Sequence, residues 1–580
     1  MILLLLALLC LQAAAIQQLQ VNEVRERMGL EGMWTLVREP TNGGDVGLKA
    51  KWNEQQLADF QNATEMPVPS AFNDLGDRTL RDHFGWVWVF IRLDSVNYYA
   101  IVFVNGAEAT RHEGGHLPFE VEITHLIQPH TKITIAVNNT LSLETVPQGE
   151  FVYNKPDFPV LDGKNITLPG MERRYPEGSF QWKGPFDFFH YAGILRPVQL
   201  LFRPKAYLDG FKINADMNGN LNYTFRVNGE AKEELKAAIR VRDSKGTVVF
   251  EATSLNGSGH VENAQLWYPR GLGQPNLYTI EPLYCMGVGW HEESAIRGRS
   301  WDRVIMAKDL GLFKWLGVNC VRTTHYPYAE ETIDEADKRG IAVILEVPSV
   351  SPTIWNKKSQ LVHIKLIHEA IARDSHHPSV FMWSLSNEPF AFKTHPGGRE
   401  YFKPLIELAH ELDSTRPVTI VHGQARYNND YLSDLLDVIC INRYYGWYID
   451  MGVTPDQIER DLYFDISMWK EKYDKPLMLT EYGAEHIPGI ISDPPFAFSE
   501  QYQNEVYAAT HKALDRLKAE GKITGEFAWV FADFMTHMTT TRVGGNHKGL
   551  FTRDRQPKQT AYIIRDRYNA VLKQMEKDLI

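Results

Sequence analysis

Residues 318–348 read VNCVRTTHYPYAEETIDEADKRGIAVILEVP, a strand-like run, a helical run and a second strand-like run. VNCVRTTHYP (318–327) and IAVILEVP (341–348) are strand-like, whereas ETIDEADKRG (331–340) between them has a helical pattern. A helical run, HIKLIHEAIARD (363–374), and a further strand, VFMWSLSNE (380–388), follow directly. This alternation of strands and helices is typical of a (β/α)8 barrel, which we predict for residues 286–580.

Strands two to eight of the predicted barrel can be named from the sequence. They are 318–327, 341–348, 380–388, PVTIVHG (417–423), DVICINRYY (437–445), PLMLTEYG (476–483) and EFAWVFADF (526–534). Strand one must come from LYCMGVGW (283–290), which is a poor candidate. The alternative, a doubly wound open sheet, would want a glycine-rich turn after its first strand, and the sequence has none.

Upstream of the barrel, short apolar runs are separated by Gly, Pro, Asn and Asp. In residues 16–205 they include WVWVFIRL, YYAIVFVNG, LPFEVEI and KITIAVNN, which predict an all-β sandwich. In residues 206–285 they include FKINADM, LNYTFRV, AAIRVRD and GTVVFEA, which predict a second, smaller sandwich. The 580 residues therefore divide into an all-β half and an α/β half.

The N-terminus and the glycosylation triplets predict an exported protein. MILLLLALLCLQAAAIQQ (1–18) is an apolar run that ends in small residues, so we expect residues 1–15 to be a signal peptide, and no later run is apolar enough to span a membrane. Five Asn-x-Ser/Thr triplets support export to the lysosome or the cell exterior. They stand at Asn62, Asn138, Asn165, Asn222 and Asn256.

Charge and cysteine content exclude some classes of function. The formal net charge of −11 argues against a nucleic-acid partner. Apart from Cys10 in the leader, only Cys285, Cys320 and Cys440 remain, too few for a disulfide framework and without zinc-ligand spacing. We therefore expect three buried free thiols.

Two acidic residues end apolar runs of the predicted barrel. Glu388 follows Asn387 in VFMWSLSNEPF, at the end of strand four, and Glu481 ends strand seven in KPLMLTEYGAE. Strand carboxyl ends meet at one mouth of such a barrel, so the two acids can face each other across a substrate. Two facing carboxylates suit cleavage of a glycosidic bond. Either glutamate alone is more often a solvated charge, but the pair, with Trp383 and Tyr482 beside it, favours catalysis.

WSLSNEP (383–389) is similar to the acid/base signature of family 2 glycoside hydrolases, and TEYGAE (480–485) resembles the nucleophile signature of the β-glucuronidase branch of that family. The resemblance extends from about residue 32 to the C-terminus and includes RTTHYPYAEE, INRYYGWY, FAWVFADFMT and RVGGNHKGLFTRDRQPK. It implies that Glu388 is the general acid/base and Glu481 the nucleophile of a retaining double displacement. It also implies a jelly-roll sugar-binding domain and an immunoglobulin-like domain before the barrel.

The same resemblance assigns residues around the sugar. Tyr444 or Tyr445 would hydrogen-bond the nucleophile, with Tyr444 favoured, and Asn387 would bond the sugar 2-hydroxyl. Arg542, Asn546 and Lys548 match a clamp for the C6 carboxylate of a glucuronide. The remaining matches are Asp187, Trp529 as a stacking wall, His325, His291 and Glu346, which would orient its neighbours. For each residue taken singly, the alternative is a structural role: a capping Asp, a packed aromatic ring or a hydrogen-bonded His.

Two stretches are shorter than the resemblance predicts. One lies between GWVW and YYAIVFVNG, and the other, between NLYTIEPLY and GVGWHEES, removes most of the usual first barrel strand. Either EPLYCMGVGW (281–290) substitutes as strand one or the barrel is incomplete, and WHEES (290–294) departs from the family pattern at His291.

The leading hypothesis is an enzyme that releases terminal β-D-glucuronic acid from glycosaminoglycans or glucuronide conjugates without metal or cofactor. The alternatives are β-galactosidase or β-mannosidase specificity, or a catalytically silent glycan-binding protein. By family analogy, a homotetramer is expected.

Overall fold

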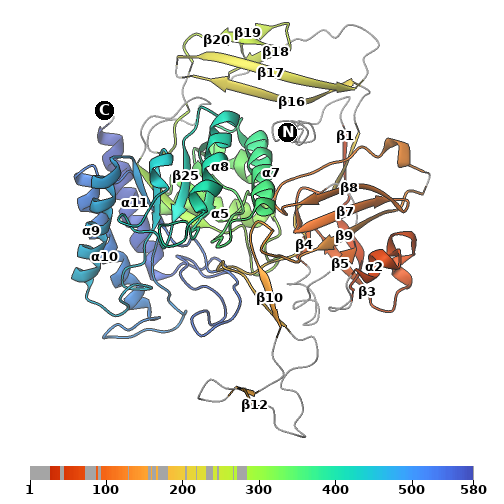
Figure 1. Ribbon diagram of the computed structural model, residues 1–580. Helices are drawn as coiled ribbons and strands as arrows, with labels where there is room; N and C mark the ends of the chain where they lie inside the picture. Colours follow the sequence, from red (N-terminus) through yellow and green to blue (C-terminus); the bar gives the residue numbers. More distant parts are fainter. Residues whose placement is uncertain are drawn as a thin grey trace.

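The computed structural model contains an eight-stranded barrel and two groups of β-sheets that precede it in the chain (Figure 1). The first group lies beside the barrel and the second lies across one end of the molecule. The structure describes residues 26–39, 45–71, 86–88, 93–128, 130–153, 158–159, 165–166, 180–202, 206–216, 218–229, 239–243, 247–264, 267–270 and 284–578. The predicted signal peptide lies outside these residues.

The C-terminal half forms a closed barrel of eight parallel strands, joined in chain order from β21 to β28. All eight strands are almost completely buried, which explains their continuous apolar sequences. The strands are β21 (Cys285–Trp290), β22 (Cys320–Thr323), β23 (Ala342–Glu346), β24 (Val380–Asn387), β25 (Val418–His422), β26 (Ile439–Asn442), β27 (Leu477–Tyr482) and β28 (Gly525–Ala528).

Of the two alternatives for strand one, the structure supports the substitute strand within EPLYCMGVGW and corrects the expectation of a truncated barrel, because β21 pairs with β22 on one side and with β28 on the other. Its glycines made it a poor candidate, yet they provide the space that the barrel interior requires. A Cβ atom at Gly287 would lie 2.2 Å from Cδ1 of Phe527, and one at Gly289 would lie 2.6 Å from Cε3 of Trp529. The two large rings on the neighbouring strand fill the volume that side chains on β21 would occupy.

Cys285 and Cys320 form a disulfide between β21 and β22, which corrects the expectation of three free thiols. The two strands are parallel neighbours, so the Cα atoms lie 5.5 Å apart, a separation that suits a disulfide. Cys440 is a free, buried thiol, and burial raises its pKa to about 12.

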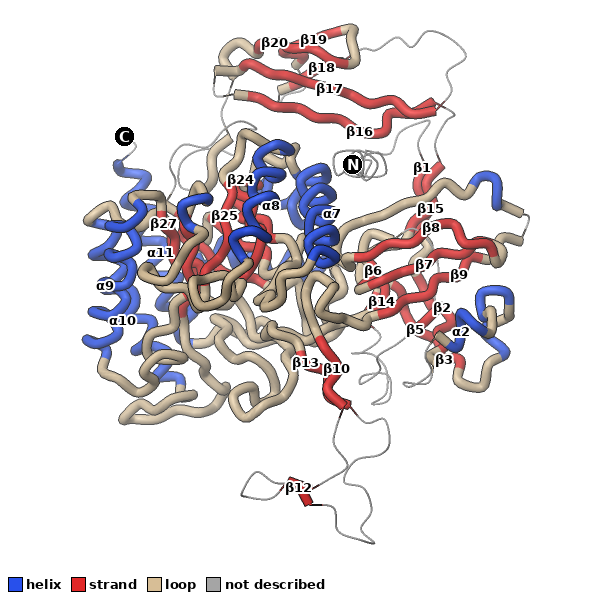
Figure 2. Tube along the Cα trace, viewed as in Figure 1, coloured by secondary structure: helices blue, strands red, loops and turns tan. Residues whose placement is uncertain are grey.

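Helices surround the barrel, with their apolar faces on the strands (Figure 2). Asp302 caps the first of them by accepting hydrogen bonds from the backbone N–H groups of Val304 and Ile305, and Asn356 caps the third through Ser359. The helices are α5 (Arg303–Leu316), α6 (Glu330–Arg339), α7 (Lys357–Asp374), α8 (Gly398–Leu412), α9 (Pro455–Tyr473), α10 (Glu500–Ala519) and α11 (Gln559–Asp578).

Antiparallel sheets make up the N-terminal part, where β7 (Tyr99–Val104) lies between β8 (Ala107–Glu113) and β9 (Ile133–Asn138). The predicted strand LPFEVEI does not form. This segment contains Pro118, which lacks a backbone N–H, and only Phe119 makes an isolated bridge, to Leu93. The other elements here are β1 (Glu26–Gly29), β2 (Gly32–Val37), α2 (Val46–Lys49), β3 (Ala63–Val68), β4 (Ser70–Ala71), β5 (Trp86–Trp88), β6 (Val96–Asn97), β14 (Gly193–Ile194) and β15 (Gln199–Phe202).

A ribbon of β10 (Glu150–Tyr153) and β13 (Phe180–Lys183) projects from the body of the molecule and is followed outward by β11 (Phe158–Pro159) and β12 (Asn165–Ile166) (Figure 2).

The middle part contains two sheets at one end of the molecule (Figure 1). One joins β16 (Ala206–Ala215), β17 (Asn220–Gly229) and β20 (Asn256–His260), and the other joins β18 (Ile239–Arg242) and β19 (Val248–Ala252). Phe211 packs edge-on against His376 of the barrel, with ring centres 5.2 Å apart. Cys285, the last residue assigned to this part from sequence, is the first residue of β21. In the part of the chain that the structure describes, no helix has the length and apolar character of a membrane span.

Candidate active site

Glu388 is the first residue after β24, at the carboxyl end of the barrel. Its backbone has φ of 46°, an uncommon conformation for a residue with a side chain, and its N–H donates to Val421 of β25. The carboxyl group lies against Gly423, where a Cβ atom would be 2.5 Å from Cδ of Glu388. Burial, and then the charge of Glu481, raise the pKa of Glu388 to about 7. Glu388 is therefore a carboxyl group that keeps its proton at mildly acidic pH.

Glu481 lies in β27 and receives a hydrogen bond on each carboxylate oxygen. Nη1 of Arg322 donates to Oε1 over 2.8 Å, and the hydroxyl of Tyr444 donates to Oε2 over 2.5 Å. Burial and the neighbouring Glu481 charge raise the pKa of Tyr444 well above its ordinary value, so its hydroxyl remains a donor. These two donors fix the orientation of the Glu481 carboxylate.

Arg322, in β22, connects the residues of this end of the barrel, although the sequence analysis did not single it out. It is fully buried and donates to both oxygens of Glu346 (3.1 and 3.2 Å) and to Oδ1 of Asn387 (2.7 Å). Burial would raise the pKa of Glu346, but Arg322 and His325 lower it below its ordinary value. The sequence feature that could have identified Arg322 is its position in RTTHYPY, one residue from the end of a barrel strand.

Asn442, the last residue of β26, is a second residue that the sequence analysis did not select. Its Nδ2 donates to Oε1 of Glu388 over 2.7 Å and to Oδ1 of Asn387 over 3.2 Å, while its Oδ1 accepts from Thr480. Asn442 therefore holds the Glu388 carboxyl group beside Asn387.

The two candidate tyrosines after β26 face different surroundings. Tyr444 bonds Glu481, whereas Tyr445 donates its hydroxyl to Asp465 of α9 over 3.1 Å and so is directed away from the carboxylates. Trp383 and Tyr482 likewise use their polar atoms elsewhere, on Asp413 and His511. The structure therefore brings only Tyr444 of these aromatic residues to the carboxylate pair.

A second cluster joins the loop after β28 to the N-terminal part of the chain. Arg542 donates to both oxygens of Asp187 at 2.6 to 2.9 Å, and Nδ2 of Asn546 donates to Oδ2 of the same carboxylate over 3.0 Å. Lys548 donates to Glu485 over 3.0 Å and to the hydroxyl of Tyr448 over 2.8 Å. Arg542 also donates to Glu485 and Tyr448. The sequence analysis named neither Glu485 nor Tyr448.

The donors of this cluster are unequally used. Arg542 directs its N–H groups to Asp187, Glu485, Tyr448 and the carbonyl oxygen of Thr541, which accounts for all five. Asn546 and Lys548 each keep one N–H without a partner among the described residues. The positive charges of Arg542 and Lys548 balance the negative charges of Asp187 and Glu485. The cluster therefore offers an incoming group the remaining N–H donors and no net positive charge.

Aromatic rings cover the region between strands one, two and eight. Trp529, directly after β28, stacks on His325 with centres 5.2 Å apart, and lies edge-on to His291 at 5.6 Å. His325 hydrogen-bonds Glu346 over 2.8 Å, and His291 bonds the hydroxyl of Tyr326 over 3.2 Å. Burial lowers the pKa of His291 well below its ordinary value, with His325 and Arg299 adding to the effect. His291 is therefore neutral.

The described glycosylation candidates differ in accessibility. Asn62, Asn222 and Asn256 are exposed, and Asn138 on β9 is half-buried. Asn165 belongs to β12, and its side chain lies outside the described residues.

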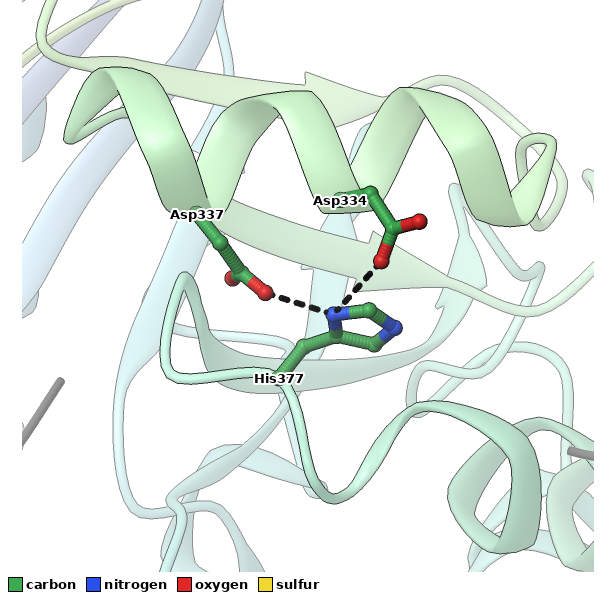
Figure 3. A group of neighbouring side chains, drawn as sticks. All are labelled: Asp334, Asp337 and His377. Carbon is green, nitrogen blue, oxygen red and sulfur yellow. Dashed lines mark hydrogen bonds and ion pairs between the residues drawn. The ribbon is translucent and has the colours of Figure 1, made fainter. Parts of the chain in front are cut away.

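One group of side chains outside the carboxylate pair has the donor types of a metal site. Asp334 and Asp337 of α6 converge on Nδ1 of His377 (Figure 3), at 4.0 and 2.7 Å. Burial would lower the pKa of His377, but Asp337 and the other carboxylates raise it. Asp337 also accepts from the backbone N–H of Ser379. We interpret the group as a hydrogen-bonded ion pair at the amino end of the barrel, opposite the carboxylate pair.

A closed (β/α)8 barrel with two carboxyl groups at the ends of strands four and seven defines the chain as a barrel-type glycosyl hydrolase. The family model of "Glycosyl hydrolases family 2, TIM barrel domain" matches residues 277–573. The chain belongs to glycosyl hydrolase family 2.

Full-length relatives support the same family. A β-glucuronidase of Felis catus is 37% identical over 612 residues, covering 94% of this chain and 91% of the relative. The β-glucuronidase of Homo sapiens is 36% identical, covering 95% and 92%. The solved structure of a Faecalibacterium prausnitzii β-glucuronidase has a TM-score of 0.85 at 33% identity, covering 96% of this chain and 99% of the other.

Proposed function

We propose that this chain is a retaining β-glucuronidase that releases terminal β-D-glucuronic acid from glycosaminoglycans or glucuronide conjugates. The observation that carries the proposal is the contrast between its two barrel carboxyl groups. Glu388 holds a proton up to a pH of about 7, whereas Glu481 accepts hydrogen bonds on both oxygens from Arg322 and Tyr444. One group is equipped to donate a proton and the other to act as a carboxylate.

In the first step, the Glu481 carboxylate attacks the anomeric carbon while Glu388 protonates the oxygen of the departing group. The bond to the leaving oxygen breaks as the bond to Glu481 forms, which gives a glycosyl ester. Asn387 accepts hydrogen bonds from Arg322, which also bonds Glu481, and from Asn442, which also bonds Glu388. In this position its amide N–H groups can bond the sugar 2-hydroxyl. That hydrogen bond strengthens as charge develops on the ring.

In the second step, Glu388 accepts a proton from water, and the hydroxide equivalent attacks the anomeric carbon to release Glu481. Ester formation has removed the negative charge beside Glu388, so the same residue can now act as a base. Two inversions give net retention, and the carboxyl groups should lie about 5–5.5 Å apart.

Recognition of the C6 carboxylate is assigned to Asn546 and Lys548, since each keeps one N–H free. Two donors match the two oxygens of a carboxylate, and the buried Lys548 supplies a charge-assisted bond. Arg542 is proposed to act by holding Asp187, Glu485 and Tyr448 around these donors, because its own N–H groups are all used. Trp529 provides the apolar wall of the sugar site, with His325 and His291 behind it.

Substrate choice is tested by comparing 4-nitrophenyl β-glucuronide with the corresponding glucoside and galactoside. Lys548→Ala should lower kcat/KM for the glucuronide by at least about tenfold and spare the other two substrates. This change leaves Arg542 as the remaining cation on Glu485, so Lys548→Met with Glu485→Gln is the matched control that removes both members of the Lys548–Glu485 pair and keeps the local charge balanced. Equal losses on all three substrates would contradict the assignment of Lys548 to the C6 carboxylate, and faster turnover of the galactoside than of the glucuronide by the unaltered protein would favour the β-galactosidase alternative.

Turnover itself separates an enzyme from a catalytically silent glycan-binding protein. The hypothesis of a catalytically silent protein was based on the possibility of an incomplete barrel. The barrel is closed, so this reason no longer applies. Purified protein should release chromophore from the glucuronide between pH 4 and 7, and Glu481→Ala should abolish the release. Folded protein without turnover would contradict the proposal.

The remaining expectations concern the whole chain. We propose that residues 16–205 form a jelly-roll domain and residues 206–285 an immunoglobulin-like domain, that a signal peptide is removed, and that the glycoprotein reaches the lysosome or cell exterior as a homotetramer. Mass spectrometry of the secreted protein checks the new N-terminus and the glycans, and light scattering checks the tetramer.

A further inference from the structure

The loop between β21 and α5 carries a buried arginine that lacks a carboxylate partner. Other arginines in or against this loop are paired: Arg196 with Glu292 at 3.0 Å, Arg553 with Glu293 at 2.8 Å, and Arg297 with Asp302 at 3.0 Å. Arg299 is 3% exposed and makes no ion pair within the described part of the chain. Arg299 is thus the exception in a loop whose other charges are neutralised.

Two aromatic rings pack against the Arg299 guanidinium. Its central carbon lies 4.5 Å from the ring centre of Phe188 and 4.4 Å from that of Tyr326. Nη2 donates to the carbonyl oxygen of Phe189 over 2.9 Å. The centres of these two rings lie 6.0 Å apart, so the rings are neighbours on the guanidinium and do not enclose it from opposite faces.

Arg299 and the two residues that follow it carry buried hydrogen-bond donors that are not used. Nε and Nη1 of Arg299, the hydroxyl of Ser300 and Nε1 of Trp301 are buried and have no hydrogen-bond partner among the described residues. Buried N–H and O–H groups without acceptors lose their hydration and gain no hydrogen bond in return, which destabilises the fold. Three consecutive residues that direct unused donors into a protein interior indicate that an acceptor belongs there.

The carboxylates nearest to this loop are engaged with other arginines. Glu292 pairs with Arg196 and Glu293 with Arg553, and Arg196 also acts on Glu331. The nearby imidazoles are neutral, because burial, with Arg299 contributing, lowers the pKa of His116 and His291 well below the ordinary value. Burial also raises the pKa of Glu293, so acidification removes negative charge here.

We propose that the edge of Arg299, with Ser300 and Trp301, binds one small monovalent inorganic anion of the chloride class. Such an anion supplies the missing charge and accepts several N–H and O–H bonds at once. Its site lies behind Phe188, which stacks on His325 at 6.1 Å and contacts His291 at 5.7 Å. The anion therefore stabilises the junction between the N-terminal part and the barrel wall.

Thermal unfolding of the full chain tests the site at constant ionic strength, with chloride replaced by gluconate. Chloride at ten times its dissociation constant should raise the apparent Tm by about 3 °C. Arg299→Met should abolish the difference, whereas Arg297→Met, which alters a carboxylate-paired arginine of the same loop, should keep it. The same Tm in both salts would overturn the proposal.

Crystals of the unaltered protein grown in bromide give a measurement that does not depend on any variant. An anomalous peak in hydrogen-bonding contact with Arg299 is the expected result. Ordered water without anomalous signal at this position would overturn the proposal, even if Arg299→Met proved too unstable to purify.

Discussion

Removal of the Tyr444 hydroxyl tests the orientation of Glu481 directly. In Tyr444→Phe, Oε2 of Glu481 loses the donor at 2.5 Å, and Arg322 remains as its protein partner on Oε1. The ring itself should stay in place, because it packs against Tyr448 with centres 4.9 Å apart and against Lys548 at 5.7 Å. The substitution therefore changes one hydrogen bond and little packing.

The size of the effect follows from the type of bond. A hydrogen bond to a charged group contributes about 1.5–3 kcal/mol, which corresponds to about 10- to 150-fold in rate. In the proposed second step, Glu481 departs as a carboxylate, and the Tyr444 hydroxyl stabilises the charge that returns to it. Hydrolysis of the glycosyl ester should therefore become slower and limit kcat.

Stopped-flow kinetics with 4-nitrophenyl β-glucuronide measures both steps. Tyr444→Phe should lower kcat by about 10- to 150-fold and show a rapid release of chromophore before the slow steady state. Tyr445→Phe is the matched control, since its hydroxyl bonds Asp465, and kcat should change by less than about threefold. A kcat for Tyr444→Phe within threefold of the unaltered enzyme would refute the reasoning.

Four other predictions have defined outcomes. Burial and Glu481 raise the pKa of Glu388 to about 7, so the ionised form of Glu388 destabilises the fold, and the free energy of unfolding decreases as pH rises from 4.5 to 7. Glu388→Gln removes this charge. It should therefore raise the free energy of unfolding in urea by up to about 3 kcal/mol at pH 8 and leave it unchanged at pH 4. In the unaltered enzyme, kcat/KM for the glucuronide should decrease as pH rises through about 7, and a profile flat to pH 9 would contradict the role of Glu388 as acid. Replacing Cys285 and Cys320 by Ala opens a loop of 35 residues and should cost about 2–4 kcal/mol of unfolding free energy, with no further loss on adding reductant. Arg322→Met leaves buried carboxylates unpaired and should cost about 3–5 kcal/mol, measured by urea denaturation at pH 6.

Much of the barrel was predictable because buried parallel strands have continuous apolar sequences, and those runs alternate with helices. Strand one was located only as a poor candidate, because its glycines are suitable only in the presence of Phe527 and Trp529, which lie in and directly after β28, far along the chain. The disulfide depended on the same strand, since its formation requires β21 and β22 to be neighbours.

The candidate site was predictable where a motif included the acid itself, as for Glu388 and Glu481. Arg322 and Asn442 were missed because their importance comes from bonds to residues on other strands, which no local pattern reveals. Glu485 and Tyr448 were passed over although both occur within quoted motifs, since an acid or a tyrosine near a barrel mouth has many possible roles. The family resemblance suggested Asp187, and the structure shows the arginine that it meets.

The contact between Asp187 and Arg542 joins residues 355 positions apart in the chain. A fragment that starts at residue 277, where the family's barrel model begins, would keep both carboxyl groups but lose Asp187. Three N–H groups of Arg542 and Asn546 would then face solvent, and the loop that carries them would lose its anchor. Such a fragment would keep Asn546 and Lys548, the proposed donors to the sugar carboxylate, and would lose the carboxylate that holds Arg542 and Asn546 in place. The geometry of the loop after β28 therefore depends on a residue contributed by the N-terminal part of the chain.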